Sequence, residues 1–214
     1  MGQVRDFVIG RRPFSQQILR GAFFGLGLSA VFYLGVQCLP DQDFTEQEKD
    51  TLTQLFKDSI DIDDINFNRS PAGEFVLNAF NASGTTIGNT VIMRQYMPRH
   101  SAYYNYVLVH EAAHIWQSQN CHTNFFSNTF DEAVHFFDDA AEIYKYHLDA
   151  DKDLLDYNHE AQASIIADYY NFQAGKSTDF DQNEYTSPTK KDALYKAVLS
   201  NFIQDPKYIR QHCI

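Results

Sequence analysis

The sequence predicts an α+β fold, mostly helical with a small sheet, preceded by an N-terminal hydrophobic helix. Three observations support this prediction. Residues 102–118 and 159–174 have the residue spacing and the end signals of helices. Residues 64–98 contain short β-rich runs, at Ile65–Asn68, Glu74–Leu77 and Thr85–Met93, separated by turn-forming residues, which is typical of a small sheet. Residues 21–39 carry no charged side chain, and we expect them to form the hydrophobic helix.

Length and charge limit the organisation and the partners of the chain. It has 214 residues, 44% of them hydrophobic, which suits one domain with an appendage. We therefore expect two parts, residues 1–40 and residues 41–214. The net charge of −11 argues against a nucleic-acid partner, because binding phosphate requires a basic face. The sequence leaves the oligomeric state open.

Residues 21–39 come close to the ~20 residues that a helix needs to cross a bilayer. Arginines precede this segment, at Arg5, Arg11, Arg12 and Arg20, and acidic residues follow it. The positive-inside rule then predicts that residues 1–40 are a cytoplasmic tail with a membrane-spanning signal anchor, and that residues 41–214 lie on the periplasmic side. The alternatives are a glycine-rich helix in the core of a soluble domain, and a cleaved or twin-arginine signal that gives a secreted protein.

The motif His-Glu-x-x-His occurs at His110, Glu111 and His114 of the first expected helix. Residues four apart lie on one face of a helix, so the two histidines can offer imidazole nitrogens to one metal ion. Glu111 leaves the helix at a different angle and can reach a water molecule on that ion, as the general base of a zinc hydrolase does. The alternative is a buried helix with two histidines and no metal.

A catalytic zinc ion usually has three protein ligands, so the motif needs a third. The best candidate is Glu160, in the first turn of a helix with Asn158 as its N-cap and Gly175 as its stop. Asp168, two turns later, is expected to accept a hydrogen bond from the outer N–H of a ligand histidine. The alternative is that Glu160 only favours the helix N-terminus by its charge and that Asp168 is exposed.

These residues resemble a known family. His110 to Gln117 is similar to the HExxH-[VI]-W-Q signature of the Vgr-related proteins encoded near Rhs and type VI secretion genes. Three further segments resemble blocks of that family: Phe44 to Ile62, Tyr144 to Leu148, and Asp156 to Tyr170. Ala161 departs from the family pattern, and so do Ala112 and Ala113, but none of them is a proposed ligand.

The resemblance implies a zincin-like metallopeptidase domain of the gluzincin kind, with Zn²⁺ held by His110, His114 and Glu160. Zincins also have an edge strand beside the active helix that binds an extended substrate by strand addition. Thr90–Met93 is our candidate for that strand, although an interior strand is an equally good interpretation of these residues.

Several side chains are candidates for a hydrogen-bond donor that stabilises the transition state: His135, Tyr157, Tyr169 and Arg94. For His135 the commoner alternative is a surface position on a helix expected over Asp131–Leu148. A last helix is expected after Ser187–Pro188. Cys121 and Cys213 could form a disulfide in an oxidising compartment.

The sequence therefore predicts a zinc metallopeptidase in which Glu111 is the general base. Its expected substrate is a peptide or protein, with cell-wall peptide as one candidate. One alternative is a non-catalytic, membrane-attached secretion accessory protein with a structural or vestigial zinc site. A closed structural site would need a fourth ligand, such as His135 or His159. Another alternative is a toxin delivered into a different cell.

Overall fold

The computed structural model describes residues 35–36, 38–39, 42–80, 82–121, 142–177, 180–185 and 187–213. The chain divides into two compact units, Met1–Cys38 and Leu39–Ile214, and every element described below belongs to the second unit. The hydrophobic helix expected at residues 21–39 falls almost entirely outside the described residues. Within the part of the chain that is described, no helix is both long enough and apolar enough to span a membrane.

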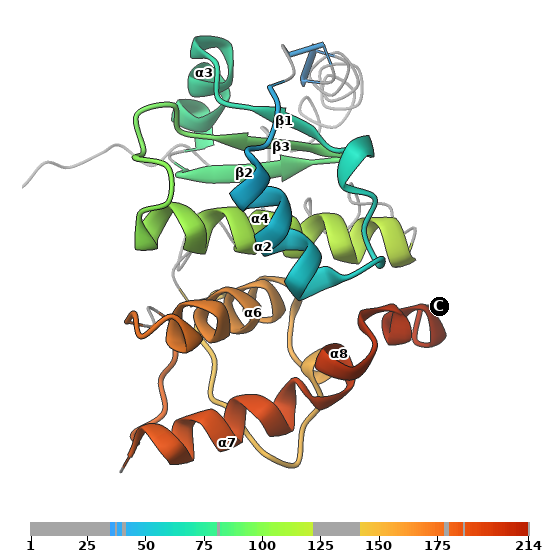
Figure 1. The fold of residues 1–214 in the computed structure, drawn as a ribbon, viewed down its shortest axis with the longest axis vertical. Coiled ribbons are helices and arrows are strands. Elements are labelled where there is room, and N and C mark those ends of the chain that lie inside the picture. The colour runs from blue at the N-terminus through green and yellow to red at the C-terminus, as the bar shows by residue number, and fades with distance from the viewer. Residues whose placement is uncertain are drawn as a thin grey trace, which may run out of the picture. The chain divides into compact units, whose positions relative to one another are not determined.

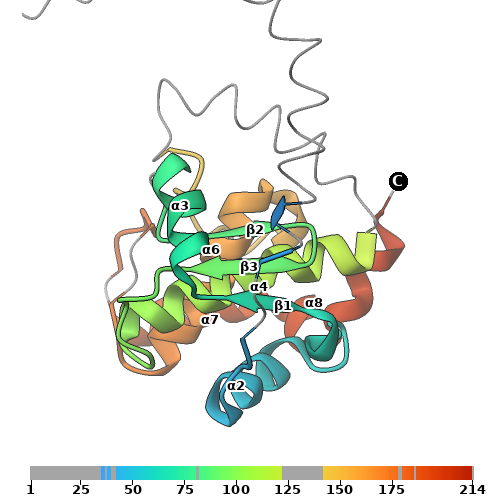
Figure 2. The same cartoon turned by 90° about the horizontal axis from the view of Figure 1, so that it is seen from above.

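The second unit combines one sheet with several layers of helices (Figures 1 and 2). Its elements in chain order are α2 (Glu46–Phe56), η2 (Ile62–Asp64), β1 (Asn66–Asn68), α3 (Pro71–Phe80), β2 (Gly84–Ile87), β3 (Thr90–Met93), α4 (Ala102–Cys121), η3 (Leu154–Asp156), α6 (His159–Gln173), α7 (Pro188–Val198), α8 (Ser200–Gln204) and η4 (Pro206–Gln211). Helix α4 lies between the sheet and α6, and α7 lies beyond α6. The predicted α+β class is confirmed.

Helix α2 begins at a capping box. The Thr45 hydroxyl accepts a hydrogen bond from the N–H of Glu48 at 3.3 Å, and the Glu48 carboxylate accepts one from the N–H of Thr45 at 2.7 Å. Glu48 is buried, accepts a further hydrogen bond from the Tyr104 hydroxyl and lies 3.6 Å from the Arg99 guanidinium. The cap therefore also fixes α2 to the beginning of α4.

The sheet has the strand order β1-β3-β2, with β1 parallel and β2 antiparallel to β3. A two-residue turn joins β2 to β3, with Gly88 in the left-handed region at φ 61°. Thr90–Met93 is the interior strand, because β1 and β2 pair with its two sides. The outer strand that packs against α4 is therefore β2.

The prediction of a β-run at Glu74–Leu77 is wrong, because these residues lie in α3. The preceding Ser-Pro-Ala-Gly has the composition of a turn, but Pro71 occupies the first position of the helix, where its missing N–H is not needed. Asn68 stabilises this start by accepting hydrogen bonds from the N–H and the hydroxyl of Ser70, at 3.1 and 3.0 Å. Turns and helix starts use the same residues, so composition alone does not separate them.

Helices α4 and α6 form the centre of the unit. Since the sheet covers one side of α4 and α6 covers another, α4 is buried on most sides and has no single apolar stripe. Helix α6 begins at the predicted N-cap, where the Asn158 side chain accepts a hydrogen bond from the N–H of Ala161 at 2.8 Å. It ends before Gly175, which has φ 69°.

The C-terminal region forms two helices instead of the predicted single one, because α7 ends at Val198 and α8 begins at Ser200. The next segment, η4, packs on α4, and the indole N–H of Trp116 donates a 2.8 Å hydrogen bond to the carbonyl of Pro206. Cys121, at the end of α4, forms a disulfide with Cys213 across a Cα–Cα distance of 5.1 Å.

The helix expected over Asp131–Leu148 can be compared only from Glu142 onward, because residues 122–141 lie outside the described part. From there the prediction is wrong: residues 142–144 form a turn, and Tyr146 forms a parallel bridge with Asp181. The cause is tertiary. The Tyr146 hydroxyl donates a 2.7 Å hydrogen bond to the buried Asp168 of α6, which holds this segment against that helix.

Candidate metal centre

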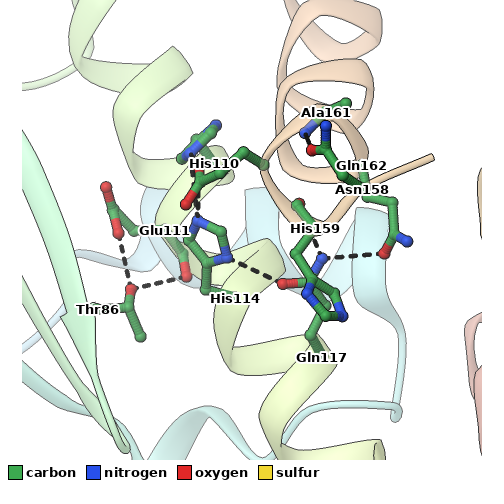
Figure 3. Close-up of polar contacts among 10 residues, drawn as sticks. Thr86, His110, Glu111, His114, Gln117, Asn158, His159, Ala161 and Gln162 are labelled. Atoms are coloured by element: carbon green, nitrogen blue, oxygen red, sulfur yellow. Dashed lines mark hydrogen bonds and ion pairs between the residues drawn. The ribbon is translucent and has the colours of Figure 1, made fainter. Parts of the chain in front are cut away.

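The two histidines of the motif meet Glu160 between α4 and α6. Nε2 of His110 lies 3.1 Å from Oε2 of Glu160, and Nε2 of His114 lies 3.3 Å from the same oxygen. The two Nε2 atoms are 3.3 Å apart. Figure 3 shows both rings in the space between the two helices. The structure thus brings together three predicted side chains from two separate segments of the sequence.

These separations fit a single metal ion. Ligand atoms about 2 Å from a zinc ion at tetrahedral angles are ~3.3 Å apart, close to the 3.1, 3.3 and 3.3 Å found here. Two imidazole nitrogens and one carboxylate oxygen are also a donor set of zinc hydrolases. Among the described residues, His110, His114 and Glu160 form a group whose ligand atoms could hold a metal ion, and His159 is not a member of it.

The electrostatics of the group favour a cation. Burial by itself lowers the pKa of His114, but the neighbouring Glu160 carboxylate outweighs this effect and raises that pKa to about 10. Burial likewise opposes ionisation of Glu160, yet the charge of His114 and the hydrogen bonds from both rings hold the pKa of this carboxyl well below its usual range. A proton on the imidazole or a metal ion can satisfy the same carboxylate.

Glu111 is held by the sheet. The Thr86 hydroxyl of β2 lies 2.8 Å from Oε2 of Glu111 and 3.0 Å from its backbone oxygen (Figure 3). The strand approaches closely because residue 84 is glycine: a Cβ there would lie 2.9 Å from Oε1 of Glu111. Burial raises the pKa of Glu111, although the charges of His110 and His114 oppose this. A buried carboxylate with a raised pKa next to the triad suits a general base.

The outer nitrogens of the two rings have different surroundings. Nδ1 of His114 lies 2.9 Å from Oε1 of Gln117. Nδ1 of His110 is buried and has no hydrogen-bond partner among the described residues. Neither of these nitrogens bonds to Asp168, so the expected role of that residue is wrong. Beside Nδ1 of His114, Gln117 lies where Asp168 was expected.

Asp168 is fully buried, and its carboxylate accepts hydrogen bonds from the Tyr146 hydroxyl at 2.7 Å and from the N–H of Phe180 at 3.2 Å. The alternative of an exposed Asp168 is therefore wrong as well. Its partners come from two loop segments that pack against α6. Asp168 anchors these segments to the helix.

The proposed transition-state donors are held by partners outside the triad: Tyr157 by the backbone of residues 147–149, Tyr169 by the ring of Tyr195, and Arg94 by the carboxylate of Glu74. His135 lies outside the described residues. The structure therefore leaves these assignments as predictions from the sequence.

Aromatic side chains around His110 were not among the predicted site residues. The His110 ring lies 5.9 Å from that of Tyr106 and 5.7 Å from that of Tyr144, and Phe180 lies 5.4 Å from Tyr144. Tyr106 precedes His110 by four residues on the same helix, so the helical period contained a signal for it. Tyr144 and Phe180 come from irregular segments, for which no such period exists.

The fold and the site define an α+β domain in which two packed helices present a His-His-Glu group that could hold a metal ion. No family model and no solved structure matches the chain. A curated protein is similar over part of it: the type VI secretion system spike protein VgrG2b of Pseudomonas aeruginosa is 28% identical over 96 residues. This stretch is 45% of the chain but only 8% of the spike protein.

Proposed function

We propose that this protein is a zinc metallopeptidase with a zincin-like domain of the gluzincin kind. The observation that carries the proposal is the convergence of His110, His114 and Glu160, whose ligand atoms lie within 3.3 Å of one another, with Glu111 next to the first of them in the chain. The partial similarity to a spike protein supports a connection with type VI secretion.

The three ligand residues would hold the ion, and Glu111 would move the proton. When bound, a zinc ion supplies Lewis-acid activation of water and of the scissile carbonyl. Glu111 takes the proton of the attacking water onto its carboxylate and passes it to the nitrogen of the leaving amine. Thr86 fixes one oxygen of that carboxylate by its 2.8 Å hydrogen bond. The other oxygen is then left for the proton.

The sheet supports an extended peptide as the substrate. Strand β2 is an outer strand, it packs against α4, and its first two residues, Gly84 and Thr85, are partly exposed. A peptide that adds to such a strand gains main-chain hydrogen bonds, while its alternate side chains provide specificity. We therefore place the peptide or protein substrate along β2 and not along Thr90–Met93.

We further propose that the domain works outside the cytoplasm, on cell-wall peptide or an envelope protein, with residues 21–39 as its membrane anchor. The disulfide between Cys121 and Cys213 supports this location, because disulfides persist in oxidising compartments. A toxin delivered into another cell is a second candidate, which the similarity to a spike protein favours. Both candidates use the same peptidase chemistry.

The test compares the full chain with its Glu111→Gln variant. Zinc content is measured by elemental analysis, and hydrolysis is measured on a peptide library and on purified cell-wall peptides. We expect one zinc per chain in both proteins and a loss of hydrolysis of about 10² to 10⁴-fold in the variant. The exposed Glu46→Gln is the matched control. Equal hydrolysis by wild type and Glu111→Gln would refute the peptidase proposal.

A further inference from the structure

Gln117 connects the two helices that carry the metal ligands. It follows His114 by three residues on α4, and the residue is 6% exposed. Its Oε1 lies 2.9 Å from Nδ1 of His114. Its Nε2 donates to the backbone carbonyl of His159 and to Oε1 of Gln162, each at 3.0 Å. The two acceptors belong to the first turns of α6, which also carry Glu160 (Figure 3).

The orientation of the Gln117 amide follows from its backbone partner. A carbonyl oxygen can only accept, so the atom of Gln117 that faces the His159 carbonyl must be the nitrogen. The same argument applies to Gln162, whose Nε2 faces the carbonyl of Tyr157 at 2.7 Å and whose oxygen therefore faces Gln117. Two backbone carbonyls at the beginning of α6 thus set the direction of the whole hydrogen-bond chain.

This chain of hydrogen bonds ends at Oε1 of Gln117, the acceptor that faces Nδ1 of His114. In the neutral ring, which is the form that binds a metal ion, an acceptor at that position keeps the remaining proton on Nδ1 and leaves the lone pair on Nε2, the nitrogen that lies 3.3 Å from Oε2 of Glu160. A metal ligand needs its lone pair on that nitrogen. The ring plane is fixed as well, because an amide that makes three hydrogen bonds cannot rotate freely.

We propose that Gln117 is a positioning residue of the metal site: it holds His114 in the metal-binding tautomer and orients the ring relative to the beginning of α6, so that His114 and Glu160 are presented together. Nδ1 of His110 has no hydrogen-bond partner among the described residues. Of the two outer nitrogens, Nδ1 of His114 is therefore the one that a described side chain holds, and that side chain is Gln117.

This inference depends on the proposed function only in taking the triad as a zinc site, and its test measures binding. The full chain and its variants are stripped of metal and titrated with Zn²⁺ against a chromophoric chelator. Gln117→Met keeps the volume and removes the acceptor, while Gln117→Glu keeps an acceptor at Nδ1 of His114. Gln173→Met, at the exposed far end of α6, is the matched control for the same substitution.

We expect Gln117→Met to weaken zinc binding by about 10 to 100-fold relative to Gln173→Met. Gln117→Glu should bind zinc at least tenfold more tightly than Gln117→Met. The Co²⁺ derivative of Gln117→Met should show a changed d–d absorption spectrum, which a merely structural defect far from the metal would leave unaltered. The melting temperatures of the metal-free variants show whether each one is folded.

Three different results would contradict the zinc site or the positioning role of Gln117. If wild type binds no zinc, the peptidase proposal and this inference both fail. If wild type binds zinc and Gln117→Met binds it equally well, only the positioning role fails. If Gln117→Glu, which keeps the acceptor at Nδ1 but loses the two hydrogen bonds to α6, binds as weakly as Gln117→Met, the proposed effect of the acceptor on the His114 tautomer fails.

Discussion

The hydroxyl of Thr86 lies 2.8 Å from Oε2 of Glu111 and 3.0 Å from the backbone oxygen of the same residue. One side chain of the outer strand therefore contacts both the main chain of α4 and the carboxylate proposed as the general base. If the substrate lies along β2, the strand that binds it also orients the group that receives its proton. Substrate binding and base orientation would then depend on one small contact.

Removing this hydroxyl should slow catalysis without removing the metal. Thr86→Val loses one hydrogen bond to a charged group, worth about 1.5 kcal/mol, and we expect kcat to fall about tenfold. KM and zinc content should stay close to those of wild type, because neither the ligands nor the backbone of β2 changes. Thr86→Ser keeps the hydroxyl and should retain most of kcat. Equal kcat values for the Val and Ser variants would contradict this role.

The close approach of β2 to α4 should be sensitive to a single methyl group. A Cβ at Gly84 would lie 2.6 Å from Cγ1 of Val107 and 2.9 Å from Oε1 of Glu111. Gly84→Ala must therefore move the strand or the carboxylate, at a cost of about 1 to 3 kcal/mol in unfolding free energy. Urea denaturation of the zinc-bound protein measures this cost. Gly175→Ala serves as a contrasting variant, since nothing lies within 4 Å there and only its φ of 69° opposes the change. Unchanged stability and activity in Gly84→Ala would show that the strand is not tightly packed.

The ligands were predictable because each one is encoded locally. His110 and His114 are separated by one helical turn, and Glu160 lies two residues after a helix N-cap, so short patterns indicate both helices and the faces that carry the ligands. The small residues of α6 also favour a close approach of the two helices. What the sequence could not provide is the distance between the helices, which the packing of the whole unit determines.

The positions that the sequence did not determine depend on partners from distant segments. Asp168 lies in the predicted helix, but its hydrogen-bond donors come from Tyr146 and Phe180, in irregular segments without a periodic pattern. The interior position of Thr90–Met93 depends on a parallel pairing with residues 66–68, across the intervening α3. The contact between Thr86 and Glu111 likewise forms only because β2 packs on α4. Pairings of this kind have no local signal.

The corrected position of Asp168 gives a prediction that separates its two roles. An acceptor for a ligand histidine would cost about tenfold or more in zinc affinity when substituted. As an anchor of the Tyr146 and Phe180 segments, Asp168 should matter for stability instead. We expect Asp168→Ala to lower the unfolding free energy by about 2 to 4 kcal/mol, because the buried Tyr146 hydroxyl and the partly buried N–H of Phe180 lose their acceptor. The zinc affinity of the folded fraction should change less than tenfold. A larger loss of affinity at unchanged stability would restore the original expectation.

The charges of the triad predict how the stability of the metal-free protein depends on pH. The pKa of His114 is raised from 6.5 to about 10, chiefly by Glu160 acting against the effect of burial. The stabilisation from its protonated ring is therefore fully present below about pH 6.5 and is lost as the pH rises through about 10. The pKa of Glu160 is lowered, so its contribution is present above its usual pKa of 4.5 and is lost only at much lower pH.

Urea denaturation of the metal-free chain at pH 6 and pH 10 measures this effect, and His114→Gln is the control that removes the group. The difference in unfolding free energy between wild type and His114→Gln should shrink from pH 6 to pH 10. Zinc should oppose the trend, because metal binding displaces the proton from His114 and therefore becomes stronger as the pH rises. A difference that stays constant over this range would mean that His114 is not protonated in the metal-free fold.

The disulfide between Cys121 and Cys213 joins residues 92 positions apart and connects the end of α4 to the C-terminal segment. Chain-entropy arguments assign about 4 to 5 kcal/mol of stability to a crosslink of that span. We expect Cys213→Ser to lower the unfolding free energy of the oxidised protein by an amount of this order, as measured by urea denaturation.

The free and exposed Cys38 provides the control, and Cys38→Ser should leave that stability unchanged. Zinc affinity should change little in Cys213→Ser, because β2 and α6 hold α4 where the ligands are, while the disulfide lies beyond the last ligand-bearing turn. The proposed location outside the cytoplasm adds a further expectation: thiol labelling of the full chain in intact cells should find Cys121 and Cys213 blocked and Cys38 reactive after denaturation. If all three cysteines react with the label before reduction, the disulfide does not form in the cell and the location loses its structural support.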